Sequence, residues 1–193
     1  QVWGLAPMSP KALQRVAYKP FIDLYRRNMT DCGALRIDHA AGLNRFWWTK
    51  QGQTADQGAY VAMPMHDLLG IIALESQRHK CIIIAEDLGT IPNELRVALS
   101  ELGAYSYKLF FGERANDGGF IDPKLYQPHA MSALTTHDMA TIKGWWQGDD
   151  LSLGVRLNVY TQEEADKLKI DRENSKQRIL DSMHGLGSIG NDI

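Results

Sequence analysis

The chain has 193 residues, of which 44% are hydrophobic, and its formal net charge is -2. This length predicts one large domain or two small ones. The near-neutral charge excludes the strong positive field with which proteins bind nucleic acid or anionic membranes. No apolar run approaches the roughly 18 residues of a membrane span, and no signal-peptide pattern is recognisable.

The chain contains only two cysteines, Cys32 and Cys81, and this usage favours a reducing compartment without disulfides. We therefore expect a soluble, cytoplasmic protein. The chain begins with Gln1 instead of Met and stops soon after Gly190 without a closing element. We expect it to be an internal segment of a longer protein.

Helices are predicted where a capping side chain or a proline precedes a run of helical periodicity. A first helix is expected to start at Ser9–Pro10. Three more are expected to run from Pro20 to about Met29, from Asp67 to near Arg78 and from Pro92 to Gly103. A last helix is expected to begin at Thr161, where Glu164 completes a capping box.

Strands alternate with these helices, at Ala34–Ile37, Cys81–Ala85, Tyr105–Phe111 and Met131–Thr135. The run Cys81–Ala85 is uniformly apolar, which predicts burial on both faces, as in parallel sheets. Residues 43–65 show no clean periodicity and are expected to form a long functional loop. The alternation of strand and helix predicts an α/β fold with a parallel sheet.

Carboxylates follow three of these strands: Asp38, Glu86 and Asp138. A single acidic residue after a strand is most often a helix cap. In parallel α/β folds, and above all in (β/α)8 barrels, reacting groups sit at the carboxyl ends of the strands. Three such carboxylates in successive units therefore predict one shared catalytic site.

The neighbours of two carboxylates give them different chemistry. Arg36 lies two residues before Asp38, so the two side chains share one face of the strand. A neighbouring guanidinium favours the ionised form of the Asp38 carboxyl group, which a nucleophile needs. The alternative is a purely structural ion pair. Glu86 follows four apolar residues, whose desolvating effect favours the protonated form of a general acid. Retaining glycosidases use one carboxyl group of each kind.

Aromatic side chains fit a sugar substrate, because their rings stack on the apolar faces of sugars. The candidates are Trp3, Trp47, Trp48, Tyr60, Trp145 and Trp146. For Trp47 and Trp48, packing in a core is an equally good interpretation.

Three motifs at the predicted strand ends resemble those of the 4-alpha-glucanotransferases, also called amylomaltases or disproportionating enzymes. They read LRIDH at 35–39, AEDLGTIP at 85–92 and THDMAT at 136–141. Supporting matches are Trp3-Gly4-Leu5, Tyr60-Val61 with Pro64, Leu74-Glu75-Ser76 and Gly144-Trp145-Trp146. Many family members carry a bulkier residue where this chain has Ala40-Ala41.

The resemblance implies part of a (β/α)8 TIM barrel, about strands 4 to 7, over residues 1–150. A helical C-terminal insertion of the same barrel would occupy 151–193. It implies transfer of α-1,4-glucan segments between maltooligosaccharides or longer α-1,4-glucans, with glucose as an acceptor, through a covalent glucosyl-Asp intermediate. It implies no cofactor, no catalytic metal, no nucleic acid and no membrane partner.

By the same resemblance Asp38 is the nucleophile, Glu86 the general acid/base and Asp138 the acid that stabilises the transition state. The substrate-binding residues that it implies are Arg36, His137, Trp3 and Tyr60.

Three alternatives stay open. The first is a retaining hydrolase of the related α-amylase group. The second is a metal-dependent barrel hydrolase whose ligands would come from Asp38-His39, Glu86-Asp87 and His137-Asp138. This alternative is disfavoured because adjacent strand residues point in opposite directions, so both members of a pair would not bind the same metal ion. The third is an inactive glucan-binding piece, and we expect the isolated chain to be inactive because a partial barrel leaves strand edges unpaired.

Overall fold

The structure is a computed structural model that describes residues 3–190. It divides into two compact units. The first holds the residues up to Tyr107 together with 129–131, and the second holds 108–128 and the residues from Ser132 onward. This division differs from the predicted boundary at residue 150, which falls inside helix α6 (Asp149–Arg156). The assignment of 1–150 and 151–193 as domains stays a prediction.

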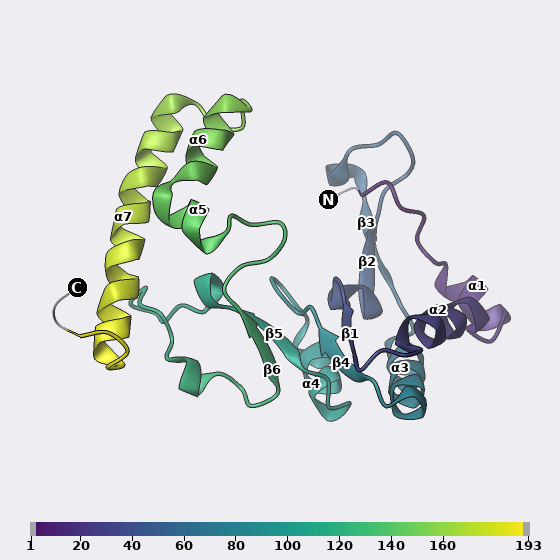
Figure 1. Ribbon diagram of the computed structural model, residues 1–193. Coiled ribbons are helices and arrows are strands. Elements are labelled where there is room, and N and C mark those ends of the chain that lie inside the picture. The colour runs from purple at the N-terminus through teal and green to yellow at the C-terminus, as the bar shows by residue number, and fades with distance from the viewer. Residues whose placement is uncertain (1–2, 191–193) are drawn as a thin grey trace. The chain divides into compact units, whose positions relative to one another are not determined.

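The first unit alternates helices and strands, as the sequence predicts (Figure 1). Its elements are α1 (Pro10–Arg15), α2 (Lys19–Met29), β1 (Ala34–Ile37), the 3-10 helix η1 (Ala40–Leu43), β2 (Arg45–Trp48), η2 (Ala55–Gln57), β3 (Ala59–Ala62), α3 (Met65–His79), β4 (Ile82–Ala85) and α4 (Asn93–Glu101). Strand β5 (Ser106–Leu109) begins in this unit and continues into the second.

Local signals define most helix starts. The hydroxyl of Ser9 accepts a hydrogen bond from the backbone N–H of Ala12, which caps α1 as predicted. The prediction that Asp67 caps α3 is wrong, because that helix begins at Met65 after Pro64. The Asp67 carboxylate instead accepts a hydrogen bond from the hydroxyl of Tyr18, so a long-range partner determines its role.

A parallel pair of strands lies at the centre of the first unit. Strand β1 pairs with β4 in parallel, from Ala34 opposite Ile82 to Ile37 opposite Ala85. An isolated parallel bridge then joins Ile84 to Tyr105, just before β5. The predicted parallel arrangement is confirmed for these strands.

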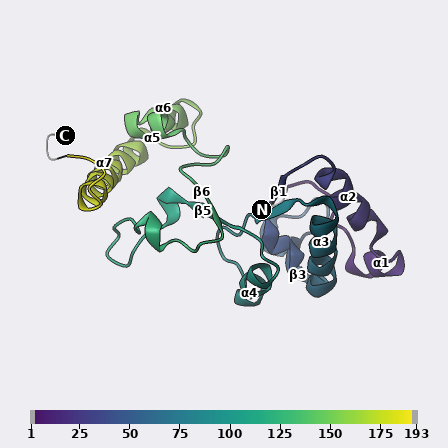
Figure 2. The same cartoon turned by 60° about the horizontal axis from the view of Figure 1, so that its bottom comes forward.

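The core lies between this pair and the helices. Helices α2 and α3 pack side by side (Figures 1 and 2). Their fully buried side chains include Met29, Leu68 and Ile72. Only one face of β4 is buried, since Ile83 is in the core while Ile82 is 49% exposed, so the prediction of burial on both faces is wrong here. Alternate strand residues point to opposite faces, and an apolar run does not reveal which face the helices cover.

The segment predicted as a long loop contains a hairpin. Strands β2 and β3 are antiparallel, with Trp47 opposite Tyr60 in the register, and the Trp47 indole donates a hydrogen bond of 2.8 Å to the carbonyl of Ala55 in η2. The loop prediction is wrong for these strands. The two strands are stabilised by cross-strand aromatic contact, which sequence periodicity does not show.

The second unit is mainly helical beyond its short strands. It contains η3 (Phe110–Gly112), η4 (Pro123–Leu125), α5 (Ile142–Gln147), α6 and α7 (Gln162–Gly185), while β6 (Ala130–Ala133) crosses the boundary and pairs with β5. The capping box of Thr161 and Glu164 is confirmed. Helix α6 packs against α5 and α7, and Arg172 of α7 binds Asp150 of α6 with both guanidinium nitrogens, at 2.8 and 2.9 Å. Within residues 3–190, no helix is long and apolar enough to cross a bilayer.

Candidate active site

Asp38 and Glu86 lie at the same end of two paired strands. Ile37 is opposite Ala85 in the parallel register, and each carboxylate residue follows directly. The backbone N–H of Glu86 donates to the carbonyl of Ile37 at 2.9 Å, which continues the pairing to the last residue before Asp38. The predicted convergence at the carboxyl edge of the strands is therefore confirmed for these two residues.

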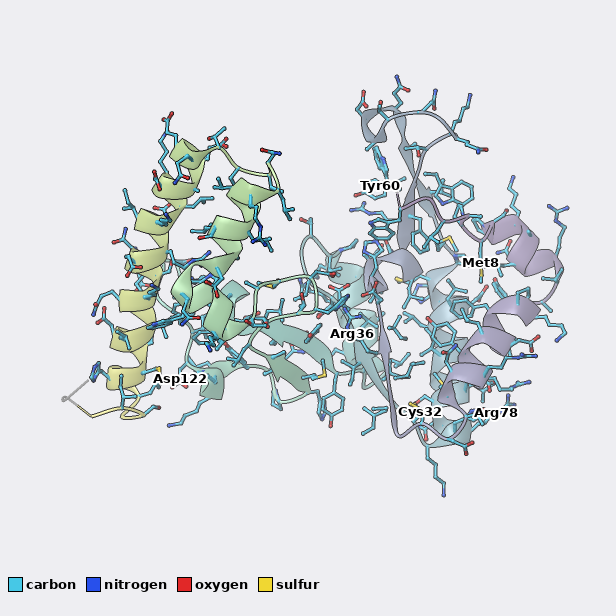
Figure 3. The ribbon with its side chains drawn as sticks, turned by 45° about the horizontal axis from the view of Figure 1, so that its top comes forward. Met8, Cys32, Arg36, Tyr60, Arg78 and Asp122 are labelled. Atoms are coloured by element: carbon cyan, nitrogen blue, oxygen red, sulfur yellow. The ribbon has the colours of Figure 1, made fainter. Side chains whose placement is uncertain are left out.

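Asp38 is exposed and paired with a cation. Its side chain is 72% exposed, and its Oδ1 lies 2.7 Å from Nη1 of Arg36. The Arg36 guanidinium, which is labelled in Figure 3, also lies over a ring, that of Tyr107, 5.4 Å from its centroid. This contact restricts the guanidinium while leaving the Asp38 carboxylate open to a ligand. Tyr107 was not predicted from the sequence, because nothing local connects it to Arg36.

Glu86 is half-buried and is held by backbone donors. Its Oε2 accepts a hydrogen bond from the N–H of His39 at 2.8 Å, and its Oε1 accepts one from the N–H of Leu88 at 3.2 Å. The Glu86 carbonyl accepts a further bond from the N–H of Ala40 at 2.9 Å. The turn that follows Asp38 is thus tied directly to Glu86.

His39 has the left-handed conformation that this turn requires. Its φ is 46° and its ψ is 57°, values that are uncommon for a residue other than glycine. Its ring meets that of Trp3 edge-on, with centroids 4.9 Å apart, and Trp3 is 55% exposed. The assignment of Trp3 to substrate binding stays a prediction. The sequence analysis did not predict the backbone role of His39, for which the position next to Asp38 is the only local signal.

Asp87 has a different role from its neighbour Glu86. Its buried carboxylate accepts hydrogen bonds from the hydroxyl of Ser106, at 2.7 and 2.8 Å, and from the N–H of Tyr107, at 2.9 Å. A guanidinium nitrogen of Arg96 lies 3.5 Å away. Asp87 therefore joins the end of β4 to the start of β5, and it points away from Glu86 as the alternation of side chains predicts. Among residues 3–190, no three His, Cys, Asp or Glu side chains gather as metal ligands would.

Tyr60 lies on the hairpin, and its ring contacts are with other hairpin residues. The Arg45 guanidinium lies 4.2 Å from the Tyr60 ring centroid, and the Trp47 ring meets it at 4.9 Å. Tyr60 is nevertheless 58% exposed (Figure 3). It lines an open pocket of about 610 Å³ between the hairpin and the first turns of α3 and α4, together with Arg45, Asn44, His66, Asp67 and Glu94.

His137 and Asp138 lie in the second unit, beyond the end of β6. The His137 Nε2 is 3.3 Å from Oδ2 of Asp138, and both side chains are exposed. The hydroxyl of Thr136 accepts a hydrogen bond from the Asp138 N–H at 3.2 Å. The convergence of Asp138 with the other carboxylates stays a prediction.

The remaining tryptophans have packing contacts. Trp145 lies 4.7 Å from the ring of Phe111 and 6.2 Å from that of Trp146, and the Arg172 guanidinium covers it at 4.5 Å. These contacts favour a role for Trp145 in the core of the second unit.

Comparison with known proteins connects this geometry to one family. A sequence profile described as 4-alpha-glucanotransferase matches residues 1–188. The 4-alpha-glucanotransferase of Haemophilus influenzae is 40% identical over 185 residues, which are 95% of this chain and 26% of that protein. The Mycobacterium bovis 4-alpha-glucanotransferase is 32% identical over 179 residues, covering 89% of this chain and 25% of that protein.

Two solved structures that are similar to this chain are both amylomaltases. The crystal structure of amylomaltase from Corynebacterium glutamicum superposes with a TM-score of 0.93 at 28% identity, over 98% of this chain and 27% of that one. The amylomaltase from Streptococcus agalactiae in complex with acarbose gives a TM-score of 0.63 at 25% identity, over 85% and 34% of the two chains.

The chain thus spans about a quarter of the length of these two relatives. Its α/β fold matches a part of the amylomaltase structure, while the correspondence to barrel strands 4 to 7 stays a prediction. The profile match over nearly the whole chain, together with the paired strands that carry Asp38 and Glu86, shows that the chain belongs to the 4-alpha-glucanotransferase family.

Proposed function

We propose that the protein with this sequence transfers α-1,4-glucan segments between maltooligosaccharides by a retaining double displacement. The observation that carries the proposal is the placement of Asp38 and Glu86 at the carboxyl ends of the paired strands β1 and β4. One carboxylate is exposed beside a guanidinium and the other is half-buried, as two distinct roles require.

In the first half-reaction, Glu86 in its protonated form gives its proton to the glycosidic oxygen while Asp38 attacks the anomeric carbon. The bond to the leaving glucan breaks, and the remaining glucan is held as an ester on Asp38. Arg36, whose Nη1 lies 2.7 Å from Oδ1 of Asp38, orients the carboxylate before the attack.

In the second half-reaction, Glu86 is a carboxylate and acts as the base. It takes the proton from the 4-hydroxyl of an acceptor glucan or of glucose, whose oxygen attacks the anomeric carbon and releases Asp38. The N–H groups of His39 and Leu88 donate hydrogen bonds to Glu86 and hold its carboxyl group in position. Two inversions leave the α configuration unchanged.

The other residues are assigned by sequence motif and exposure. We assign Asp138 to stabilisation of the oxocarbenium-like transition state, and His137 with Arg36 to the sugar bound there. Trp3 and Tyr60 present exposed rings for sugar stacking. The acarbose complex of the Streptococcus agalactiae amylomaltase supports an oligosaccharide ligand. We further propose a cytoplasmic location and a reaction that needs no cofactor.

The test uses the protein at its natural length with maltotriose, and follows glucose, longer maltooligosaccharides and total reducing ends. Transfer leaves the number of reducing ends constant, whereas hydrolysis by an α-amylase-type enzyme adds one for each bond broken. Asp38→Asn should abolish product formation. The control is Asp171→Asn, which changes an exposed carboxylate on α7 and should leave the activity intact. An active Asp38→Asn variant would refute the assignment of the nucleophile.

A further inference from the structure

The two cysteines occupy equivalent positions in two successive helix–strand units. Each follows directly after a residue with left-handed backbone, Asp31 with φ 57° before Cys32 and Lys80 with φ 52° before Cys81. Each also begins the approach to a strand, since β1 starts two residues after Cys32 and β4 one residue after Cys81. The cysteines thus lie at the amino ends of β1 and β4, opposite to the ends that carry the carboxylates.

The strand pairing brings these two amino ends together. Ala34 is opposite Ile82 in the parallel register, and the N–H of Ile82 donates to the carbonyl of Gly33 at 2.9 Å. Positions 32 and 81 therefore face each other with an offset of one residue. Strands about 4.8 Å apart with a rise of about 3.3 Å per residue give such positions a Cα separation of roughly 6 Å. A disulfide accommodates about 4.4–6.8 Å.

The two cysteine side chains also interact directly with each other. The Cys32 thiol donates to the carbonyl of Ala34, with the sulfur 2.7 Å from the oxygen, and the Cys81 thiol lies 3.7 Å from the carbonyl of Ile82. Burial raises the pKa of the Cys81 thiol, and the neighbouring Cys32 raises that pKa further through charge and a side-chain hydrogen bond.

Access to solvent differs between the two thiols. Cys81 is 2% exposed and belongs to the hydrophobic core, whereas Cys32 is half-buried at the edge of that core. Backbone hydrogen bonds hold both residues, from Cys32 N–H to Met29 and from Cys81 N–H to Ser76. A small oxidant therefore reaches Cys32 first, and Cys81, whose side chain interacts with that of Cys32, is the neighbouring thiol that can resolve the product.

We propose that Cys32 and Cys81 form an oxidation-sensitive dithiol that closes to an intrachain disulfide by exchange with a small disulfide such as oxidised glutathione. Cys32 loses its proton to solvent, and its thiolate attacks one glutathione sulfur, which forms a mixed disulfide and releases one glutathione thiolate. Cys81 then loses its proton and attacks the sulfur of Cys32, which releases the second glutathione. Two electrons pass from the two cysteines to one glutathione disulfide, which becomes two thiols.

The experiment treats the folded protein, at its natural length, with oxidised glutathione. Remaining thiols are blocked with iodoacetamide in denaturant, and a tryptic digest without reductant is measured by mass spectrometry. Trypsin releases Cys32 in peptide 28–36 and Cys81 in peptide 81–96. The expected product is the two peptides joined, with a mass two hydrogens below their sum, formed in most molecules and absent without the oxidant.

Two variants separate the steps. Cys81→Ala should carry glutathione stably on peptide 28–36, because the resolving thiol is gone. Cys32→Ala should show no glutathione on peptide 81–96, because Cys81 is buried. Circular dichroism checks that each variant is folded. If a variant does not fold, the digest of the wild-type protein still shows whether the disulfide between Cys32 and Cys81 forms. A wild-type protein that retains glutathione on Cys32, or that keeps both thiols free, would overturn the proposal.

Discussion

The backbone N–H of His39 donates a 2.8 Å hydrogen bond to Oε2 of Glu86, so the residue directly after Asp38 holds the second carboxylate. We infer that the bond depends on the left-handed conformation of His39, with φ 46°, because this conformation forms the turn that lies against Glu86. A backbone conformation at one strand end thereby positions a side chain at the end of the neighbouring strand.

This dependence is testable with two substitutions that both remove the imidazole. Glycine adopts the left-handed region readily, whereas a β-branched residue there is a strong outlier. We expect His39→Val to have a kcat/KM for maltotriose roughly 10- to 100-fold below that of His39→Gly, because a hydrogen bond to a charged group contributes about 1.5–3 kcal/mol. Asn158, with φ 56°, offers a matched control, since its glycine and valine variants should be equally active. Equal activity of the two His39 variants would refute the backbone role.

Glu86 and Asp87 should respond differently to substitution although they are adjacent. Glu86→Gln removes the proton donor and should lower kcat by at least about 100-fold, with little change in the melting temperature. Asp87→Ala leaves the buried hydroxyl of Ser106 and the N–H of Tyr107 without their acceptor. We expect it to destabilise the fold by about 2–4 kcal/mol. Differential scanning calorimetry with maltotriose assays measures both effects. If Asp87→Ala retained full stability, the interpretation of Asp87 as a structural link would fail.

Glu75 should make the stability of the first unit depend on acid pH. Its side chain is 1% exposed and binds the guanidinium groups of Arg26, at 2.9 Å, and Arg78, at 2.8 Å. The hydrogen bond from Arg26, aided by Arg78, lowers the pKa of Glu75 from 4.5 to about 2. Because the folded-state pKa is the lower one, the stabilisation is complete above pH 4.5 and is lost as the pH falls toward 2.

The size of this effect is at most about 3 kcal/mol, and it is smaller to the extent that water screens the half-exposed arginines. Thermal unfolding of the wild type and Glu75→Gln, measured between pH 7 and pH 2.5, checks it. The variant should start less stable and lose less stability in acid. Parallel curves for the two proteins would show that Glu75 does not titrate in this way.

Tyr60 allows a test of sugar stacking at a residue other than the two carboxylates, Asp38 and Glu86. The ring is exposed and lines the open pocket beside the hairpin, where it contacts Arg45 and Trp47. We expect Tyr60→Ala to raise KM for long maltooligosaccharides several-fold with kcat nearly unchanged. Tyr60→Phe keeps the ring and should behave as the wild type. A KM that is unaffected in Tyr60→Ala would remove Tyr60 from the substrate-binding residues.

The sequence alone determined the elements whose signals are local. Strand β1 begins and ends at the predicted residues, Ala34 and Ile37, and the Ser9 cap and the Thr161 capping box are where they were expected. Such features depend on residues a few positions apart, whose hydrogen bonds and periodicity are the same in any fold. The placement of Asp38 and Glu86 at strand ends follows from the same local information.

The tertiary structure decided the features that depend on distant partners. The hairpin forms because Trp47 meets Tyr60 across the two strands, and Asp67 binds Tyr18 of the preceding segment instead of capping its own helix. Likewise, Asp87 is structural because the hydroxyl of Ser106, on the next strand, donates a hydrogen bond to its carboxylate. Whether a polar side chain caps, pairs or reacts is set by the groups that folding brings within about 3 Å of it, and these groups are far away in the sequence.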